Sequence, residues 1–351
     1  MPTHPSTILA TVAILALGCS PHPTQPSPTG SANQSLPAPS DLSTVSERNT
    51  HNDHAPWERI PEDQATGDKT RRNDNPDGND PTKNFPDKHV TAHPTQHSGS
   101  LTKPVRMIAW NVESGGNDPA IIATQLSAFQ GCDVICLSEV NDANFERYAS
   151  ALDDQYHEVH GNTGRSDRLQ ILVRRDRYDV LEHTELSQYR EHTLNKGNHR
   201  SPLFVRIKNR NSGTEMIVMT NHLARGNAEF RQDQAVGLRE WARDQNVPVI
   251  ALGDFNMDYD YRRMKGNAAF DEMVRDNVWT WLAPHDFIDT NWSDRDGDGN
   301  DNYPDSMLDL AFAAGAAKEW GIECRVIVRP DDFPDDKSTS DHRPIELVFG
   351  R

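Results

Sequence analysis

The sequence predicts an α/β fold in residues 104–351, and three observations support this prediction. Short apolar stretches typical of buried strands recur through the region, and two longer segments have helical periodicity. Some of these strands follow one another directly and others are separated by a helix, which favours stacked α/β layers over a doubly wound parallel sheet. The third observation is that 15 of the 23 prolines lie at or before Pro104, so we expect the folded core after that residue.

The expected elements follow in chain order. Val105–Asn111 has the composition of a buried strand, and Asp118 is expected to cap a helix that reaches about Phe129. A second buried strand is expected over residues 133–137, and helices over 141–152 and 228–245. Further strands are expected over residues 169–174, 203–207, 215–220, 248–252, 307–313, 324–328 and 344–349.

Composition narrows the class of protein. Four cysteines are too few for a disulfide scaffold, and Cys132 and Cys136 are too far apart along an extended strand to pair, so we expect core thiols. The formal net charge is −17, which excludes a basic protein that coats polyanions. An acidic surface repels nucleic acid and anionic membranes, and phosphate chemistry on it is therefore expected to depend on divalent metal.

The first 103 residues predict export. Residues 8–18 form an apolar stretch that ends at Cys19, as in an export signal over residues 1–19. Cys19 resembles the lipid-modified cysteine of bacterial lipoproteins, although an ordinary cleaved signal remains an alternative. Residues 20–103 are rich in Pro, Ser, Thr and Asn without apolar periodicity, which predicts a disordered linker. We therefore expect an extracytoplasmic protein, secreted or attached to a bacterial envelope through Cys19.

Polar residues recur where the predicted strands of the folded part begin or end, and one of them, Asp309, lies within a strand. Strand ends are where a rigid scaffold presents functional groups, so the joint pattern indicates a catalytic site. These eight residues are Asn111, Glu139, His222, Asp254, Asn256, Asp309, Asp341 and His342.

Two motifs among them, GDFN at 253–256 and SDHRP at 340–344, resemble those of the endonuclease/exonuclease/phosphatase superfamily. The resemblance covers residues 105–351 and makes residues 104–351 the expected catalytic domain. It implies a four-layer α/β/β/α sandwich, in which two mixed sheets pack face to face with helices outside. It also implies a metal-dependent phosphoric ester hydrolase.

The chemistry of the residues gives the same expectation for the metal. A hard divalent cation prefers oxygen ligands, so Asn111, Glu139 and Asp341 are the candidate ligands, for Mg²⁺ by default or for Mn²⁺. Such an ion polarises a phosphoryl oxygen and neutralises developing charge.

The resemblance assigns the proton-transfer groups. It implies that Asp309 orients His342, and that Asp254, held by or near Asn256, contacts the nucleophilic water. Either Asp254 or the His342–Asp309 pair accepts the proton, and the sequence leaves both readings open.

The resemblance also suggests how the leaving group departs. His222 is the candidate general acid, and Asp167 is its expected partner. Arg200 resembles an arginine that lies near substrate phosphate in the family.

Residues 294–305 resemble a calcium-binding loop with oxygen side chains at its ligand positions and glycine at its sixth position. The alternative is a solvated acidic loop. The candidate calcium ligands are Asp294, Asp296, Asp298, Asn300, Asn302 and Asp305.

The substrate is the least specified part of the prediction. His222 in its NHL context resembles the deoxyribonuclease and sphingomyelinase branches, and of these we expect an endonuclease that acts on extracellular nucleic acid. The alternative of the same fold is a phospholipid or small-molecule phosphodiesterase or a phosphatase, with Trp279, Trp281, Phe287 and Trp292 either meeting a lipid face or lying in the core. A more distant alternative is a non-catalytic, calcium-dependent surface protein. We infer no obligate protein partner.

Overall fold

The computed structural model describes residues 103–293, 298–303, 306–330 and 339–350. The predicted export signal, Cys19 and nearly all of the predicted linker lie outside these residues. Within the described part, no helix has the length and apolar character needed to cross a membrane.

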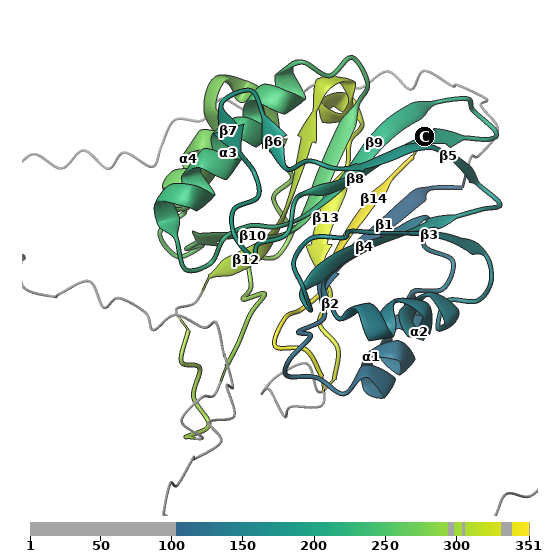
Figure 1. Cartoon of the computed structure of the whole chain (residues 1–351), viewed down its shortest axis with the longest axis horizontal. Helices are drawn as coiled ribbons and strands as arrows, with labels where there is room; N and C mark the ends of the chain where they lie inside the picture. Colours follow the sequence, from purple (N-terminus) through teal and green to yellow (C-terminus); the bar gives the residue numbers. More distant parts are fainter. Residues whose placement is uncertain (1–102, 294–297, 304–305, 331–338, 351) are drawn as a thin grey trace, which may run out of the picture. The chain divides into compact units, whose positions relative to one another are not determined.

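Two six-stranded mixed sheets form the centre of the fold (Figure 1). Parallel pairs join β1 to β2 and β9 to β10, and the other neighbouring strands are antiparallel. The strand order of the first sheet is β13 (Glu323–Val326), β14 (Ile345–Phe349), β1 (Val105–Asn111), β2 (Val134–Val140), β4 (Arg168–Arg174), β3 (Tyr156–His160). That of the second is β11 (Trp279–Trp281), β12 (Met307–Ala314), β10 (Val249–Tyr259), β9 (Glu215–His222), β8 (Leu203–Asn209), β5 (Tyr178–Glu185).

Helices cover the outer face of each sheet. The first sheet is covered by α1 (Pro119–Leu126) and α2 (Phe145–Ser150), and the second by α3 (Ala228–Arg243) and α4 (Ala268–Val274) (Figure 1). A short hairpin of β6 (Gln188–Tyr189) and β7 (His192–Thr193) lies against α3. The architecture is the four-layer α/β/β/α sandwich that the sequence resemblance predicted.

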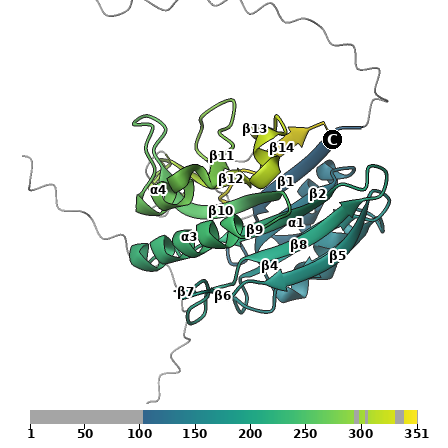
Figure 2. The ribbon, with the colours of Figure 1, turned by 90° about the horizontal axis from the view of Figure 1, so that it is seen from above.

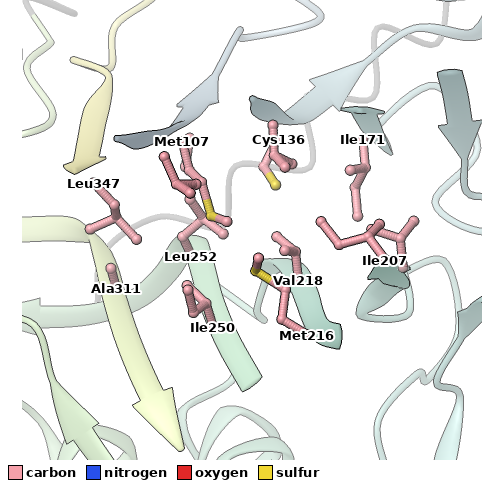
Figure 3. Close-up of a cluster of buried hydrophobic side chains, with 14 of the residues drawn as sticks. Met107, Cys136, Ile171, Ile207, Met216, Val218, Ile250, Leu252, Ala311 and Leu347 are labelled. Atoms are coloured by element: carbon pink, nitrogen blue, oxygen red, sulfur yellow. The ribbon is translucent and has the colours of Figure 1, made fainter. Parts of the chain in front are cut away.

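The apolar pattern of each strand explains the layers. In β1, Met107 and Ala109 face the second sheet, whereas Ile108 and Trp110 face the helices, because successive side chains of a strand point to opposite faces. Figure 3 shows the buried cluster between the sheets, with Met107 and Leu347 from one sheet opposite Ile250 and Val218 from the other. This interior extends along the sandwich until polar residues replace the apolar ones at one end.

Most of the predicted elements are present. The Asp118 carboxylate accepts a hydrogen bond from the Ala120 N–H at 2.8 Å, so it caps α1 as predicted, and a 3₁₀ turn extends the helix to Phe129. The prediction missed the edge strands β3, β5 and β11, the hairpin and α4. It also ended β10 at residue 252, seven residues before the observed end at Tyr259.

The side chains of the 279–292 loop correct one sequence expectation. Trp279 is buried, and Trp281 and Phe287 pack against the cluster beneath α4, with Tyr259 and Phe270 as ring neighbours. Trp292 is partly buried. Trp279, Trp281 and Phe287 therefore belong to or pack against the core, which favours the core alternative for these three side chains.

The described cysteines are core thiols, as predicted. Cys132, Cys136 and Cys324 are all free and buried. Burial raises the pKa of the Cys132 thiol to about 11 and that of Cys324 to about 12.

Candidate active site

The register of three neighbouring strands places Asp309, Asp254 and His222 in one row. Asp254 of β10 lies opposite Asp309 of β12 on one side and opposite His222 of β9 on the other. In β10, Ile250 and Leu252 point into the space between the sheets, and Asp254 continues the same alternation. The strands that build the core thus also aim three catalytic candidates at the polar end of that space.

Asp254 is the centre of the site. Its Oδ2 lies 3.4 Å from Nε2 of His222 and 3.9 Å from Nε2 of His342, and it accepts a hydrogen bond from Nδ2 of Asn111 at 3.1 Å. Its Oδ1 accepts the Asn256 backbone N–H at 2.9 Å. Burial alone would raise the pKa of Asp254, but the nearby His222, His342 and Arg225 lower it, so the group is a carboxylate at neutral pH.

His342 and Asp309 form a buried pair, as predicted from the resemblance. Nδ1 of His342 lies 2.7 Å from Oδ2 of Asp309. Burial alone would lower the pKa of His342, but Asp309, Asp341 and Asp254 raise it well above its ordinary value. Burial raises the pKa of Asp309, although the attraction of His342 works against this. The surrounding carboxylates therefore favour the imidazolium form of His342.

Short polar contacts hold this pair in place. The His342 carbonyl accepts a hydrogen bond from Nε1 of Trp110 at 2.9 Å, and its N–H donates to the Ser340 hydroxyl at 3.0 Å. The Thr290 hydroxyl accepts the backbone N–H groups of Leu308 and Asp309 at 2.9 and 3.1 Å. Ser340 belongs to the SDHRP motif that the sequence analysis identified. Thr290 lies in no motif, and the sequence did not predict its contact with the site.

A second histidine–carboxylate pair lies on the other side of Asp254. Nδ1 of His222 lies 3.3 Å from Oδ1 of Asp167, an ion-pair distance without hydrogen-bond alignment. Arg200 donates from Nη1 to Oδ2 of Asp167 at 2.7 Å. Burial alone would raise the pKa of Asp167, but Arg200 and then His222 lower it to about 2. The structure therefore joins Asp167 and Arg200 to the site.

Asn256 supports Asp254 through its backbone alone. Its side chain donates to the Leu223 carbonyl at 3.0 Å and accepts from Arg225 at 3.2 Å, and Arg225 also binds Asp258 at 2.6 Å. Arg225 is a site neighbour that the sequence did not reveal. Asn256 has a φ of 51°, a left-handed conformation that is uncommon outside glycine and is often found at functional sites.

Glu139 occupies an irregular position in β2. The pairing with β4 shifts between Leu137 and Val140, and Glu139 within this irregularity has a φ of 56°. Its Oε1 accepts from Nδ2 of Asn111 at 3.0 Å and lies 3.6 Å from Nε2 of His222. The irregularity turns a carboxylate from a buried strand towards the row of catalytic candidates.

The donor set fits a divalent cation. Among the described residues, Glu139, Asp167 and His222 offer ligand atoms that all lie within 4.8 Å of one another. Asn111 presents its NH₂ group to Glu139, because its Oδ1 accepts the Glu113 N–H at 3.0 Å, so ligation through the amide oxygen requires a rotation of the amide. Oδ1 of Asp341 lies 3.8 Å from Nε2 of His342. The ligand roles predicted for Asn111, Glu139 and Asp341 stay predictions.

The predicted calcium loop is described only in part. Asp294, Asp296 and Asp305 lie outside the described residues, and Asp298, Asn300 and Asn302 are exposed. The Asp298 side chain accepts the Asn300 N–H at 2.8 Å, and Oδ1 of Asp301 accepts the N–H groups of Ser293 and Tyr303 at 3.0 and 2.9 Å. Calcium binding by this loop also stays a prediction.

Comparison with known proteins identifies the class. Residues 108–342 match the sequence profile of the endonuclease/exonuclease/phosphatase family. The chain therefore belongs to this family, whose members are phosphoric ester hydrolases such as nucleases and phosphatases and depend on divalent metal. No curated protein sequence matches the chain.

Solved structures share the fold. TDP2 of D. rerio, in complex with a single-strand DNA product, is 18% identical and has a TM-score of 0.56 over 71% of this chain and 100% of its own. An endonuclease/exonuclease/phosphatase family protein from Bacteroides thetaiotaomicron is 17% identical, with a TM-score of 0.52 over 71% and 97%. A mannosyl-6-phosphatase from the same species is 17% identical, with a TM-score of 0.50 over 70% and 99%.

Proposed function

We propose that this protein is an exported, divalent-metal-dependent phosphodiesterase that hydrolyses nucleic acid by attack of water on phosphorus. The observation that carries the proposal is the position of Asp254 between two imidazoles. Each imidazole has a carboxylate beside its Nδ1, Asp167 for His222 and Asp309 for His342. Such a site has three groups able to hold or move a proton around one reaction centre.

Glu139, with Asn111 and Asp341, would hold the cation beside this row. When bound, a divalent cation supplies neutralisation of charge on the phosphoryl oxygens. Mg²⁺ is the default ion and Mn²⁺ the second choice, because the proposed ligands are oxygens.

The protonation states of Asp254 and His342 favour Asp254 as the base that accepts the proton of the attacking water. Asp254 is a buried carboxylate, so it is able to orient a water molecule and accept its proton. His342 carries its proton already, because Asp309 stabilises the imidazolium. We therefore assign it to donate a hydrogen bond to a phosphoryl oxygen.

His222 is assigned to the leaving group. Its Nε2 faces Asp254 and Glu139, while Asp167 and Arg200 lie behind it. An alkoxide leaving group needs a proton as its bond to phosphorus breaks, and His222 is the candidate donor. Hydrolysis of a phosphodiester in a nucleic acid backbone releases an alkoxide of this kind.

Nucleic acid is the preferred substrate over lipid for one structural reason. Three of the four aromatic side chains that would have favoured a lipid surface, those of Trp279, Trp281 and Phe287, belong to or pack against the core. The arginine excess of the domain is weaker support, since most described arginines already pair with carboxylates, including Arg106, Arg174, Arg177, Arg190, Arg206 and Arg239.

The export part of the proposal rests on sequence alone. The apolar stretch of residues 8–18 ends at Cys19, and a prolyl and polar stretch separates it from the catalytic domain. Secretion or attachment to a bacterial envelope through Cys19 would place the enzyme among extracellular nucleic acids.

The test is a substrate panel with the full chain and Mg²⁺ or Mn²⁺. Wild type, Asp254→Asn and the exposed control Asp271→Asn are each given plasmid DNA, RNA, a phospholipid, bis-p-nitrophenyl phosphate and a sugar phosphate. We expect wild type and the control to cleave nucleic acid and Asp254→Asn to lose about 100-fold or more in rate.

Other outcomes separate the alternatives. Activity confined to lipid, to the small diester or to the sugar phosphate would replace the nucleic acid proposal with the corresponding hydrolase. Absence of any metal-dependent turnover in folded wild type would contradict the enzymatic assignment and favour a non-catalytic surface protein.

A further inference from the structure

The β6–β7 hairpin is fastened to helix α3 on the outer side of the second sheet. Figure 1 and Figure 2 both show β6 and β7 beside α3. The Tyr189 hydroxyl donates a hydrogen bond to Asp244, and Arg190 pairs with the same carboxylate at 2.7 Å. None of these residues belongs to the active site described above.

Helix α3 has a face shaped to receive His192 of this hairpin. Asp233, Gly237 and Glu240 are spaced by four and three residues, so they lie on one face of the helix. A Cβ at Gly237 would lie 2.8 Å from the His192 Cβ and 2.8 Å from Cδ2 of Leu194. Glycine is unfavourable inside a helix, and here its small size allows the hairpin to approach the helix backbone.

The two ring nitrogens of His192 have different surroundings: a carboxylate orients Nδ1, and Nε2 faces two further carboxylates. Nδ1 of His192 lies 2.6 Å from Oδ1 of Asp233. That contact makes Nδ1 the protonated nitrogen of the neutral ring and leaves the Nε2 lone pair on the opposite side. Nε2 lies 3.8 Å from Oε1 of Glu240 and 3.9 Å from Oε1 of Glu191, beyond hydrogen-bond distance.

These three ligand atoms form a compact set. Nε2 of His192 and the carboxylate oxygens of Glu191 and Glu240 all lie within 4.8 Å of one another. Arg190 approaches the other oxygen of Glu240, Oε2, at 3.3 Å and leaves Oε1 facing the histidine. A histidine ligand with a carboxylate behind its other nitrogen is the usual arrangement around protein-bound transition metals.

We propose that His192, Glu191 and Glu240 form a second metal site for a divalent transition cation of the zinc class, with Asp233 orienting the histidine. One imidazole and two carboxylates suit such a cation better than Mg²⁺, which prefers oxygen ligands alone. The carboxylates of Glu191, Asp233 and Glu240 lie beside His192, and the Arg190 guanidinium pairs with the oxygen of Glu240 that faces away from the histidine. The bound cation connects the hairpin to α3, in which Asp233 lies 41 residues after His192.

The test must report on one histidine, because the chain has 15. Trypsin cleaves after Arg190 and Lys196 and releases a peptide in which His192 is the single histidine. We therefore measure the rate at which diethyl pyrocarbonate modifies this peptide in the native full chain, across a Zn²⁺ titration, with mass spectrometry as the readout. Mg²⁺ is titrated in parallel.

The variants are Glu240→Gln and Glu191→Gln, with Glu229→Gln in the first turn of α3 as the matched control. We expect Zn²⁺ to protect His192 in wild type and in the control, and the apparent Kd to rise about tenfold or more in each ligand variant. Glu191 has a side chain 76% exposed, so its replacement leaves the fold intact. Circular dichroism of each variant verifies folding.

Two results would overturn the proposal. The first is a modification rate of His192 in wild type that does not change with Zn²⁺. The second is protection that is equal in wild type and in the folded Glu191→Gln and Glu240→Gln variants. Protection by Mg²⁺ at similar concentration would contradict the assignment of the cation class.

Discussion

At the scale of single residues, the two histidines of the site differ in the carboxylate that each depends on. His342 lies 2.7 Å from Asp309, whose side chain is fully buried. His222 lies 3.3 Å from Asp167, whose side chain is 27% exposed. The tighter pair favours the imidazolium form of His342. The two imidazoles beside Asp254 therefore differ in how closely a carboxylate approaches them.

The Asp309→Asn variant tests the charge on His342. Removing the carboxylate lowers the pKa of His342, because Asp309 is the largest of the influences that raise it. If His342 acts as an imidazolium, activity is lost as pH rises through its pKa, so the alkaline limb of the kcat/KM profile is expected to move to lower pH. A profile in which the acidic limb moves instead would assign His342 as the base.

Asp167 provides a second test, on stability. Its pKa is lowered from 3.8 to about 2, so the carboxylate stabilises the folded state above about pH 4, and this contribution is lost as pH falls towards 2. The shift corresponds to about 2 kcal/mol. In urea unfolding with chelator present, the stability difference between wild type and Asp167→Asn is expected to shrink by about that amount between pH 5 and pH 2. A difference that stays constant would contradict the pairing with Arg200.

At the scale of elements, the sequence predicted the strands that are buried on both faces. β1 and β12 are largely apolar and almost wholly buried, and such segments are recognised without information on their pairing partners. β5 is exposed over most of its length and α4 has seven residues, so neither has a strong periodic signal. β10 extends beyond the predicted end because its polar GDFN segment remains paired up to Asp254 and continues to Tyr259.

The sequence predicted which residues form the site, but it did not predict the contacts among them. The strand ends indicated that Asp254, His222 and Asp309 would share one end of the fold. Their arrangement in a row depends on strand register, which a single sequence does not specify. Contacts from loops, such as Thr290 with the backbone of Asp309, depend on tertiary structure and leave no local pattern.

Gly253 links strand geometry to the site. It has a φ of 136°, and a Cβ there would lie 2.5 Å from the Asn221 carbonyl oxygen of β9. We expect Gly253→Ala to push β9 and β10 apart beside His222 and Asp254, with a loss of about 2 kcal/mol or more in unfolding free energy and a larger proportional loss of kcat. Thermal unfolding and steady-state kinetics measure the two effects. Wild-type values for both would contradict the close approach.

At the scale of the whole molecule, the described cysteines report on global unfolding. Cys132 lies in the cluster beneath α1, Cys136 lies between the sheets, and Cys324 lies in the edge strand β13. All are buried and their thiol pKa values are raised, so the reactive thiolate is scarce in the native state.

We therefore expect no more than slow alkylation of these thiols in native Cys19→Ser protein. Mass spectrometry of iodoacetamide-labelled peptides should give similar rates for Cys132 and Cys136, since both need cooperative unfolding to become accessible. Fast labelling of Cys136 alone would show that the sheets separate without unfolding of the outer layers.

Strand β1, which pairs with β14, leads from the start of the folded part to the catalytic end of the sandwich. Val105 lies opposite Phe349, and from there β1 runs to Asn111 at the site, about 20 Å away for seven residues of strand. The described chain therefore enters the sandwich at the end of β1 that is remote from Asn111 and the other catalytic candidates.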